Sequence, residues 1–189
     1  MRINIFRDPD PEDPRKAYDH VASMVCMHKR YKIGDEHPFR ASDFSGWDGV
    51  EEAIREHVKD VVALMPLYAL DHGILQLSLT SPSCPWDAGQ VGLVYVSRTQ
   101  AAEYGIEDID ENLAKEIIRA EVKEYAAYVR GDVYGFEILS DQGEHLDSCC
   151  GFFDLVHCKE EAKRSLMYLE EEKKKQPPSM VPAPRCATE

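Results

Sequence analysis

The stretch LDHGILQLSLTSPSCPWDAGQVGLVYVS, residues 70–97, decides the fold of this chain. It holds two segments of β type. Ile74–Thr80 alternates apolar and polar residues with a period near two, and Gln90–Ser97 is rich in branched and aromatic residues. Between them lies the loop Ser81–Gly89, which contains two prolines, a thiol, an indole and a carboxylate. Because this loop is too long for a two-residue hairpin, we expect it to project from the sheet.

Predicted strands and predicted helices flank this central stretch on both sides. We predict strands at 2–6, 24–28, 133–139 and 148–154, and helices at 48–62, 98–104, 112–130 and 159–175. The helix at 112–130 has the clearest signals, because Asp110 can cap its start and Gly131 can end it. Pro66 is expected to end the helix at 48–62. Grouped helices and strands predict an α+β fold, with a mostly antiparallel sheet and two or three packed helices.

The length of 189 residues fits one domain, which we place at residues 1–175 with the charged helix at its end. The segment 176–189 has four prolines and few apolar residues, so we expect a disordered tail. No apolar run reaches the roughly 18 residues that a membrane helix needs. The N-terminal segment has no apolar core of a secretory signal. These features predict a cytoplasmic protein without membrane contact.

The six cysteines do not have the spacing of a secreted disulfide framework, and we predict free thiols. Cys26 with His28, and His157 with Cys158, offer soft ligands. However, the chain has neither a CxxC pair nor an HExxH motif. No glycine-rich phosphate loop follows a strand. We therefore predict no metal site and no cofactor.

The net charge of −13 is concentrated in one part of the chain. Residues 99–154 carry four basic and 14 acidic residues, a net charge of −10. Such a field repels nucleic acid and attracts basic surfaces. Since no basic, aromatic-rich patch supplies phosphate contacts, direct binding of DNA or RNA is not expected.

A row of carboxylates lies on the predicted helix at 112–130 and the loop leading into it. Its members are Glu103, Glu107, Asp108, Asp110, Glu111, Glu116, Glu121, Glu124 and Asp132. If all are solvated, the row could imitate the phosphates of a duplex and compete for a basic cleft. The alternative interpretation is an ordinary solvated helix face, and the sequence alone favours it over mimicry.

A cysteine nucleophile is a second functional interpretation. Cys84 lies in the projecting loop, and Asp71 and His72 precede it. A thiolate at neutral pH needs a nearby base or positive field, and His72 could serve as that base. The alternative is that Cys84 packs as a small apolar residue under Trp86. The order Asp71, His72, Cys84 matches no protease signature.

Several motifs together resemble a family of uncharacterised proteins encoded by bacteriophages and mobile elements. They are Met24–Tyr31 (MVCMHKRY), Gly34–Asp35, Ser83–Gly92 (SCPWDAGQVG), Tyr95–Ser97, Glu103–Gly105, Glu121–Tyr125 and Gly131–Gly135, with Pro14–Arg15 before them. The resemblance spans roughly residues 1–153. It implies a phage setting inside a bacterial host cell, where small acidic proteins often inhibit host defence as antirestriction or anti-CRISPR proteins. It implies no catalytic residues.

The concentrated negative charge and the phage setting that the resemblance implies together predict an accessory protein. It would block a basic, nucleic-acid-binding host protein through its acidic face. Trp86 and Asp87 in the projecting loop would form a second contact, since an exposed indole is a good interface anchor. Two alternatives stay open: a small cysteine-dependent hydrolase using Cys84, and a structural accessory protein of the phage particle. Self-association as a homodimer is also left open.

Overall fold

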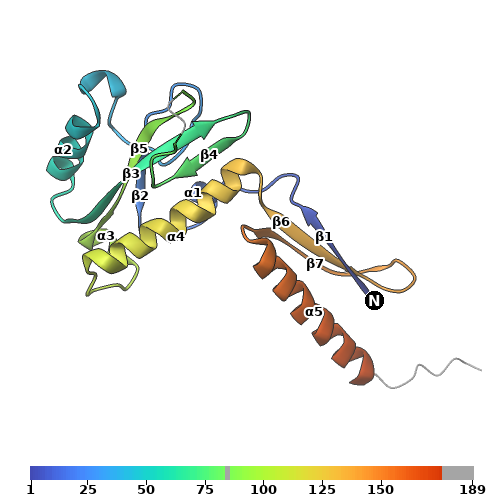
Figure 1. Ribbon diagram of the computed structural model, residues 1–189. Helices are drawn as coiled ribbons and strands as arrows, with labels where there is room; N and C mark the ends of the chain where they lie inside the picture. The colour runs from blue at the N-terminus through green and yellow to red at the C-terminus, as the bar shows by residue number, and fades with distance from the viewer. Residues whose placement is uncertain (84–85, 176–189) are drawn as a thin grey trace, which may run out of the picture.

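The computed structural model describes residues 1–83 and 86–175. The expectations for Cys84 and for the tail at 176–189 therefore lie outside the described residues. The elements in chain order are β1 (Arg2–Arg7), α1 (Pro14–Ala17), β2 (Ser23–Cys26), η1 (Ala41–Asp43), α2 (Trp47–His57), β3 (Val61–Asp71), β4 (Leu75–Ser78), β5 (Ala88–Ser97), α3 (Arg98–Glu103), α4 (Glu111–Arg130), β6 (Tyr134–Leu139), β7 (His145–Phe152) and α5 (Leu155–Lys175). Figure 1 shows their arrangement.

The larger sheet has the strand order β2-β5-β3-β4, and all its pairs are antiparallel. Helix α4 lies across one face of this sheet (Figure 1), where Ile118, Val122 and Tyr125 join the main core. Helix α2 covers the opposite face with Val50 and Ile54. Burial on both faces explains why the middle strands are almost uniformly apolar rather than alternating.

Strand β3 replaces part of a predicted helix. The helix expected at 48–62 ends at His57, and Val61–Asp71 forms a strand in the interior of the larger sheet. The prediction that Pro66 ends a helix was wrong, since Pro66 lies within β3 opposite Leu93. The valines at 61 and 62 fitted the helical spacing, but they begin the buried apolar run of a strand instead.

The smaller sheet has the order β1-β6-β7 and is also antiparallel. Helix α5 lies along one face of it (Figure 1) and buries Cys158 and Ala162 against Phe136 and Ile138. This cluster is separate from the two clusters of the larger sheet. Each sheet thus has its own apolar core.

The α+β prediction, with antiparallel strands and packed helices, is confirmed. The strands are divided between two sheets, whereas the sequence suggested one. Helix α4 starts beside the larger sheet and ends at Gly131, directly before β6 of the smaller sheet. None of the helices in the described ranges is both long and apolar enough to cross a bilayer.

Candidate functional site

The acidic row predicted from sequence separates into two groups in the structure. Six of its members are exposed and lie between the end of α3 and the second turn of α4. They are Glu103, Glu107, Asp108, Asp110, Glu111 and Glu116, which we call the acidic corner. Glu111 pairs with Lys115, and Asp110 caps α4 by accepting from the Leu113 amide at 2.8 Å. Within the described chain, the other four members have no ion-pair partner.

The remaining three carboxylates of the row are only partly exposed. Asp132 pairs with Arg7 and Arg130, at 3.0 and 2.9 Å. Glu124 is partly buried, and this burial raises the pKa of its carboxyl group above the ordinary range. The Glu121 side chain is only 16% exposed. The expectation that the whole row is solvated is therefore not met at its C-terminal end.

Glu121 belongs to a network centred on Arg15, whose side chain is only 2% exposed. Arg15 donates from Nε and Nη2 to the two oxygens of Asp35, at 2.7 and 2.5 Å. Its Nη1 donates to Glu121 at 2.9 Å, and its Nη2 also donates to the carbonyl of Ala22. Burial by itself lowers the pKa of Arg15, but the hydrogen bonds and charges of Asp35 and Glu121 outweigh it and raise that pKa.

The two carboxylates of this network also bind backbone amides of the segment before and within β2. Glu121 accepts from the amides of Val21 and Ala22, and Asp35 accepts from the Met24 amide at 2.6 Å. Each of these partly buried carboxylates is thus satisfied by both a guanidinium and backbone amides. The network ties α1, β2 and α4 together, so its role is structural.

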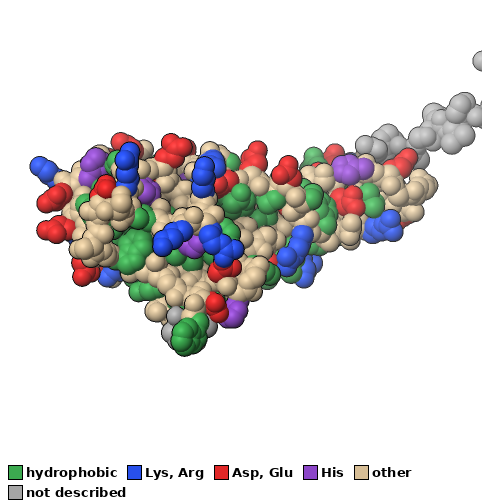
Figure 2. Space-filling view, turned by 90° about the horizontal axis from the view of Figure 1, so that it is seen from above, with side chains coloured by type: hydrophobic (Ala, Val, Ile, Leu, Met, Phe, Trp, Pro, Cys, Tyr) green, Lys and Arg blue, Asp and Glu red, His purple; other side chains and the backbone are tan. Residues whose placement is uncertain are grey.

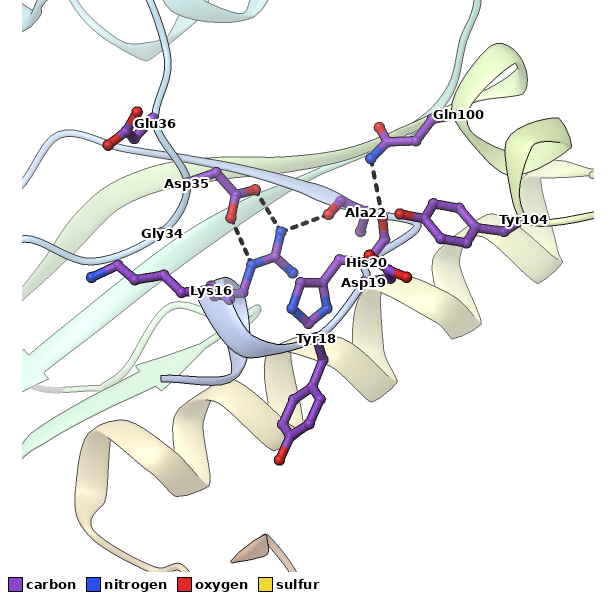
Figure 3. A pocket seen from close by; sticks show the side chains of 11 residues that line it. Lys16, Tyr18, Asp19, His20, Ala22, Gly34, Asp35, Glu36, Gln100 and Tyr104 are labelled. Carbon is purple, nitrogen blue, oxygen red and sulfur yellow. Dashed lines mark hydrogen bonds and ion pairs between the residues drawn. The ribbon is translucent and has the colours of Figure 1, made fainter. Parts of the chain in front are cut away.

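A hollow of about 370 Å³ lies over this network (Figure 3). Its walls come from the segment around α1, from the Gly34–Glu36 loop and from α3 with Tyr104. Gln100 is held in place because it donates to the His20 carbonyl and accepts from the Ser23 hydroxyl. The hollow shares Tyr104 with the segment that forms the acidic corner, so the two surfaces adjoin.

A second polar cluster forms at the other end of β5. The Tyr31 hydroxyl and Arg30 Nη1 both donate to Asp71 Oδ2, at 3.1 and 3.0 Å. The Asp71 amide donates to the carbonyl of Asp87, which leads into β5. His72 Nε2 lies 3.1 Å from Asp87 Oδ2. Three loops thus meet at this end, around a hollow of about 360 Å³ lined in part by His28 and Gln90.

Trp86 is 90% exposed beside this cluster. Figure 2 shows hydrophobic, His and acidic side chains together on a projection at one edge of the molecule. The sequence left the exposure of Trp86 open, and the structure gives an exposed indole. Sequence analysis singled out Trp86, Asp87, Asp71 and His72. It did not assign Arg30 and Tyr31 to the same site, although both lie in the MVCMHKRY motif.

The suggested nucleophile Cys84 lies outside the described residues. Of the described thiols, Cys26 and Cys158 are buried, whereas Cys149 and Cys150 are exposed. Burial and the charge of Asp35 raise the pKa of Cys26 to about 12. Cys26 is therefore a protonated core residue at neutral pH.

Within residues 1–83 and 86–175, no group of three or more His, Cys, Asp or Glu side chains has an arrangement suited to a metal ion. His28 illustrates why, because its Nδ1 accepts from the amides of Arg30 and Tyr31 and so caps its own loop. Comparison with known proteins gave no matching family model and no significant similarity to a curated protein or a solved structure.

Proposed function

We propose that this protein is an accessory factor that binds a basic, nucleic-acid-binding protein through the acidic corner and thereby blocks it. The observation that carries the proposal is the gathering of six exposed carboxylates within the 14 residues from Glu103 to Glu116. A partner that binds nucleic acid carries a basic surface, and this corner offers it the opposite charge.

A helix cap and a turn fix the backbone of the acidic corner. Asp110 begins α4, and Gly105, at φ 77°, turns the chain between α3 and that helix. The carboxylates near the start of α4 also lie at the positive end of the helix dipole. A backbone that is ordered before binding loses less conformational freedom when a partner docks.

The corner supports a narrower form of mimicry than the full acidic row. Helix α4 has 20 residues, which at about 1.5 Å per residue is a rod of roughly 30 Å. Only its first turns carry exposed acids, because Glu121 and Glu124 further along the helix are partly buried. We therefore propose a compact acidic contact rather than a duplex-length imitation.

Trp86 supplies a second contact in this proposal. It lies before the start of β5, whereas the acidic corner follows the end of that strand, with α3 between them. The ten residues of β5 span roughly 33 Å, so the two contacts belong to opposite ends of this strand. The resemblance to phage and mobile-element proteins makes a host defence protein of the antirestriction or anti-CRISPR target class the proposed partner.

Affinity capture with matched variants tests the proposal. The immobilised protein is exposed to bacterial lysate and eluted with rising salt, beside a corner variant with Glu103→Lys, Glu107→Lys and Asp108→Lys. A control variant carries the same charge change on α5, as Glu170→Lys, Glu171→Lys and Glu172→Lys. The wild type and the control should retain the same nucleic-acid-binding protein, and the corner variant should lose it.

Two outcomes oppose the proposal. Equal capture by the corner variant would show that the corner is not the contact. Retention of the partner at high salt would also oppose it, because exposed charge pairs are screened within about 3 Å at 1 M salt. Trp86→Ala should weaken capture without unfolding the protein, since the indole is exposed.

A cysteine-dependent hydrolase is the second candidate, favoured by the His72–Asp87 pair at 3.1 Å. A carboxylate that orients a histidine is a common part of nucleophilic sites. Replacing Cys84 by Ala separates the two candidates. An enzyme loses its activity, whereas the proposed inhibitor keeps its partner.

A further inference from the structure

The two sheets, each with its own core, form two lobes that are joined where α4 leads into β6 (Figure 1). A hollow of about 470 Å³ lies at this junction, between α4 and the segment that joins β7 to α5. Its apolar lining comes from Ala120, which is exposed, and from Phe152 and Phe153, which are partly exposed. Hollows with aromatic walls at the junction of two structural units are common binding sites.

The walls of this aromatic hollow are held in place before anything binds. Phe152 packs against Phe136 of the smaller sheet, with ring centroids 5.9 Å apart, and against the ring of His157 at 5.6 Å. Lys123 of α4 pairs with Asp154, which precedes α5, at 3.7 Å and so connects the two walls. A preformed hollow of this kind loses little conformational freedom when a side chain enters it.

A second hollow of about 300 Å³ adjoins the aromatic one, because the two share Gly151 and Phe153. We call the two together the inter-lobe groove. Among the described residues, no Lys or Arg lines the second half of the groove. Its charged lining consists of Asp8, Asp10 and Glu12.

Carboxylates outnumber cations along the whole inter-lobe groove. Glu124 and the paired Asp154 and Lys123 are the charged residues of the aromatic half. The complete lining thus holds five carboxylates and one ammonium group, a net charge of −4. Arg7 and Lys16, which flank the acidic segment in the chain, already pair with other carboxylates.

We infer that the inter-lobe groove holds a short basic segment of the partner protein, with one large apolar side chain in the aromatic half and Lys or Arg side chains over the acidic half. The inference rests on the function proposed above, since it names the part of the basic partner that this surface takes. The charge of the groove repels an acidic segment, and a segment without an apolar side chain leaves the phenylalanines uncovered.

The inter-lobe groove continues the surface of the acidic corner. Glu116, the last member of the corner, lies one helical turn from Ala120, about 6 Å along the axis of α4. Leu113 and Ile117 lie on the same side of α4 as Ala120, and Leu113 is 39% exposed. One partner can therefore cover the corner and the groove together, with an apolar contact between the two charged surfaces.

A peptide titration followed by two-dimensional NMR on the full chain tests the groove. The probe is Lys-Lys-Leu-Phe-Lys-Lys, capped at both ends. One control peptide has Ala-Ala in place of Leu-Phe, and a second has Glu in place of every Lys. The probe should give saturable shifts at Ala120, Gly151 and Phe153. Each control should bind at least about tenfold more weakly, because it lacks either the apolar side chains or the matching charge.

Variants of the groove test the same contacts from the side of this protein. Ala120→Arg places a long cation in the aromatic half and should weaken the probe about tenfold. Asp10→Asn with Glu12→Gln neutralises two exposed acids and should weaken it about threefold. Met167→Arg, at a position of α5 that is 62% exposed, is the matched control and should leave binding unchanged. Melting temperatures equal to wild type show that the variants are folded.

Three results would overturn the inference. The first is equal binding of the Ala-Ala peptide, which would reduce the groove to a general acidic surface. The second is unchanged binding of the probe by Ala120→Arg. The third is a wild-type dimer in sedimentation that Ala120→Arg abolishes, because a second copy would then occupy the groove.

Failure of the groove and failure of the proposed function are distinguishable. If the probe binds the groove but no nucleic-acid-binding protein is captured from lysate, the groove stands and the proposed function falls. If the corner variant loses the partner while Ala120→Arg captures it as well as wild type does, the function stands and the groove is refuted.

Discussion

Arg15 Nη1 donates to Glu121 Oε2 over 2.9 Å, which joins two residues 106 positions apart in the chain. This contact removes Glu121 from the set of carboxylates that could meet a partner. It also fixes α4 against the segment that leads into β2. The same helix therefore has two roles: its C-terminal half holds the fold together, and its first turns carry the acidic corner.

Loss of Arg15 should be among the most destabilising single changes. Arg15→Met keeps the approximate volume but leaves Asp35 and Glu121 partly buried without their cation, which should cost about 3–5 kcal/mol of unfolding free energy. Urea unfolding measures the effect. Arg164→Met on the exposed face of α5 is the control, expected to stay within about 0.5 kcal/mol of wild type. An equally small change in unfolding free energy for Arg15→Met would show that the Arg15 network contributes little to stability.

Gly92 should tolerate no side chain. A Cβ at this position in β5 would lie 2.5 Å from the carbonyl oxygen of Val25 in the neighbouring β2. Gly92→Ala should therefore lower the unfolding free energy by about 1–3 kcal/mol. Gly89 lies in the same strand with open space around it, so Gly89→Ala should be close to neutral. Equal melting temperatures for the two variants would contradict this packing.

Thiol labelling should discriminate sharply among the described cysteines. Burial raises the pKa values of Cys26 and Cys158, and that of Cys26 reaches about 12. Both should resist iodoacetamide at pH 8 in the native protein, whereas the exposed Cys149 should react. Peptide mass spectrometry reads out each site. Rapid labelling of native Cys26 would refute the buried placement of β2.

Asp60 should make the stability of the folded state depend on pH in the acidic range. Hydrogen bonds from the Thr99 hydroxyl and amide hold the pKa of Asp60 below its ordinary value. Since this pKa is lower in the folded state, ionised Asp60 stabilises the fold above the unfolded value of about 3.9. This contribution is lost as the pH falls through the folded pKa. Asp60→Asn should therefore lower the melting temperature at pH 7, with a smaller difference at pH 3. If the difference in melting temperature between wild type and Asp60→Asn were the same at pH 7 and pH 3, this role of Asp60 would be wrong.

Much of the fold could be predicted from local patterns, and the failures have physical causes. Helix α4 was recognisable because Asp110 and Gly131 mark its ends. Strand β3 was missed because a strand covered on both faces does not alternate, and its first valines continued a helical spacing. The division into two sheets depends on which strands pair, and single-sequence periodicity does not encode pairing.

The candidate site was predicted only in part. Acids at the start of α4 were singled out and are exposed, whereas the sequence left the exposure of Trp86 open. The internal role of Glu121 was missed because its partner Arg15 lies far away in sequence. One signal was available: Glu121 falls between Ile118 and Tyr125 on the apolar face of the helix, where a solvated carboxylate is out of place.

Displacement of nucleic acid from the captured partner tests the central claim most directly. Labelled DNA or RNA is bound to the purified partner, and this protein is added at increasing concentration while the bound fraction is measured. The wild type and the α5 charge control should displace the nucleic acid at near-stoichiometric concentration, and the Glu103→Lys, Glu107→Lys, Asp108→Lys variant should not. If the partner keeps its nucleic acid with wild type, or releases it equally with the corner variant, the account is wrong.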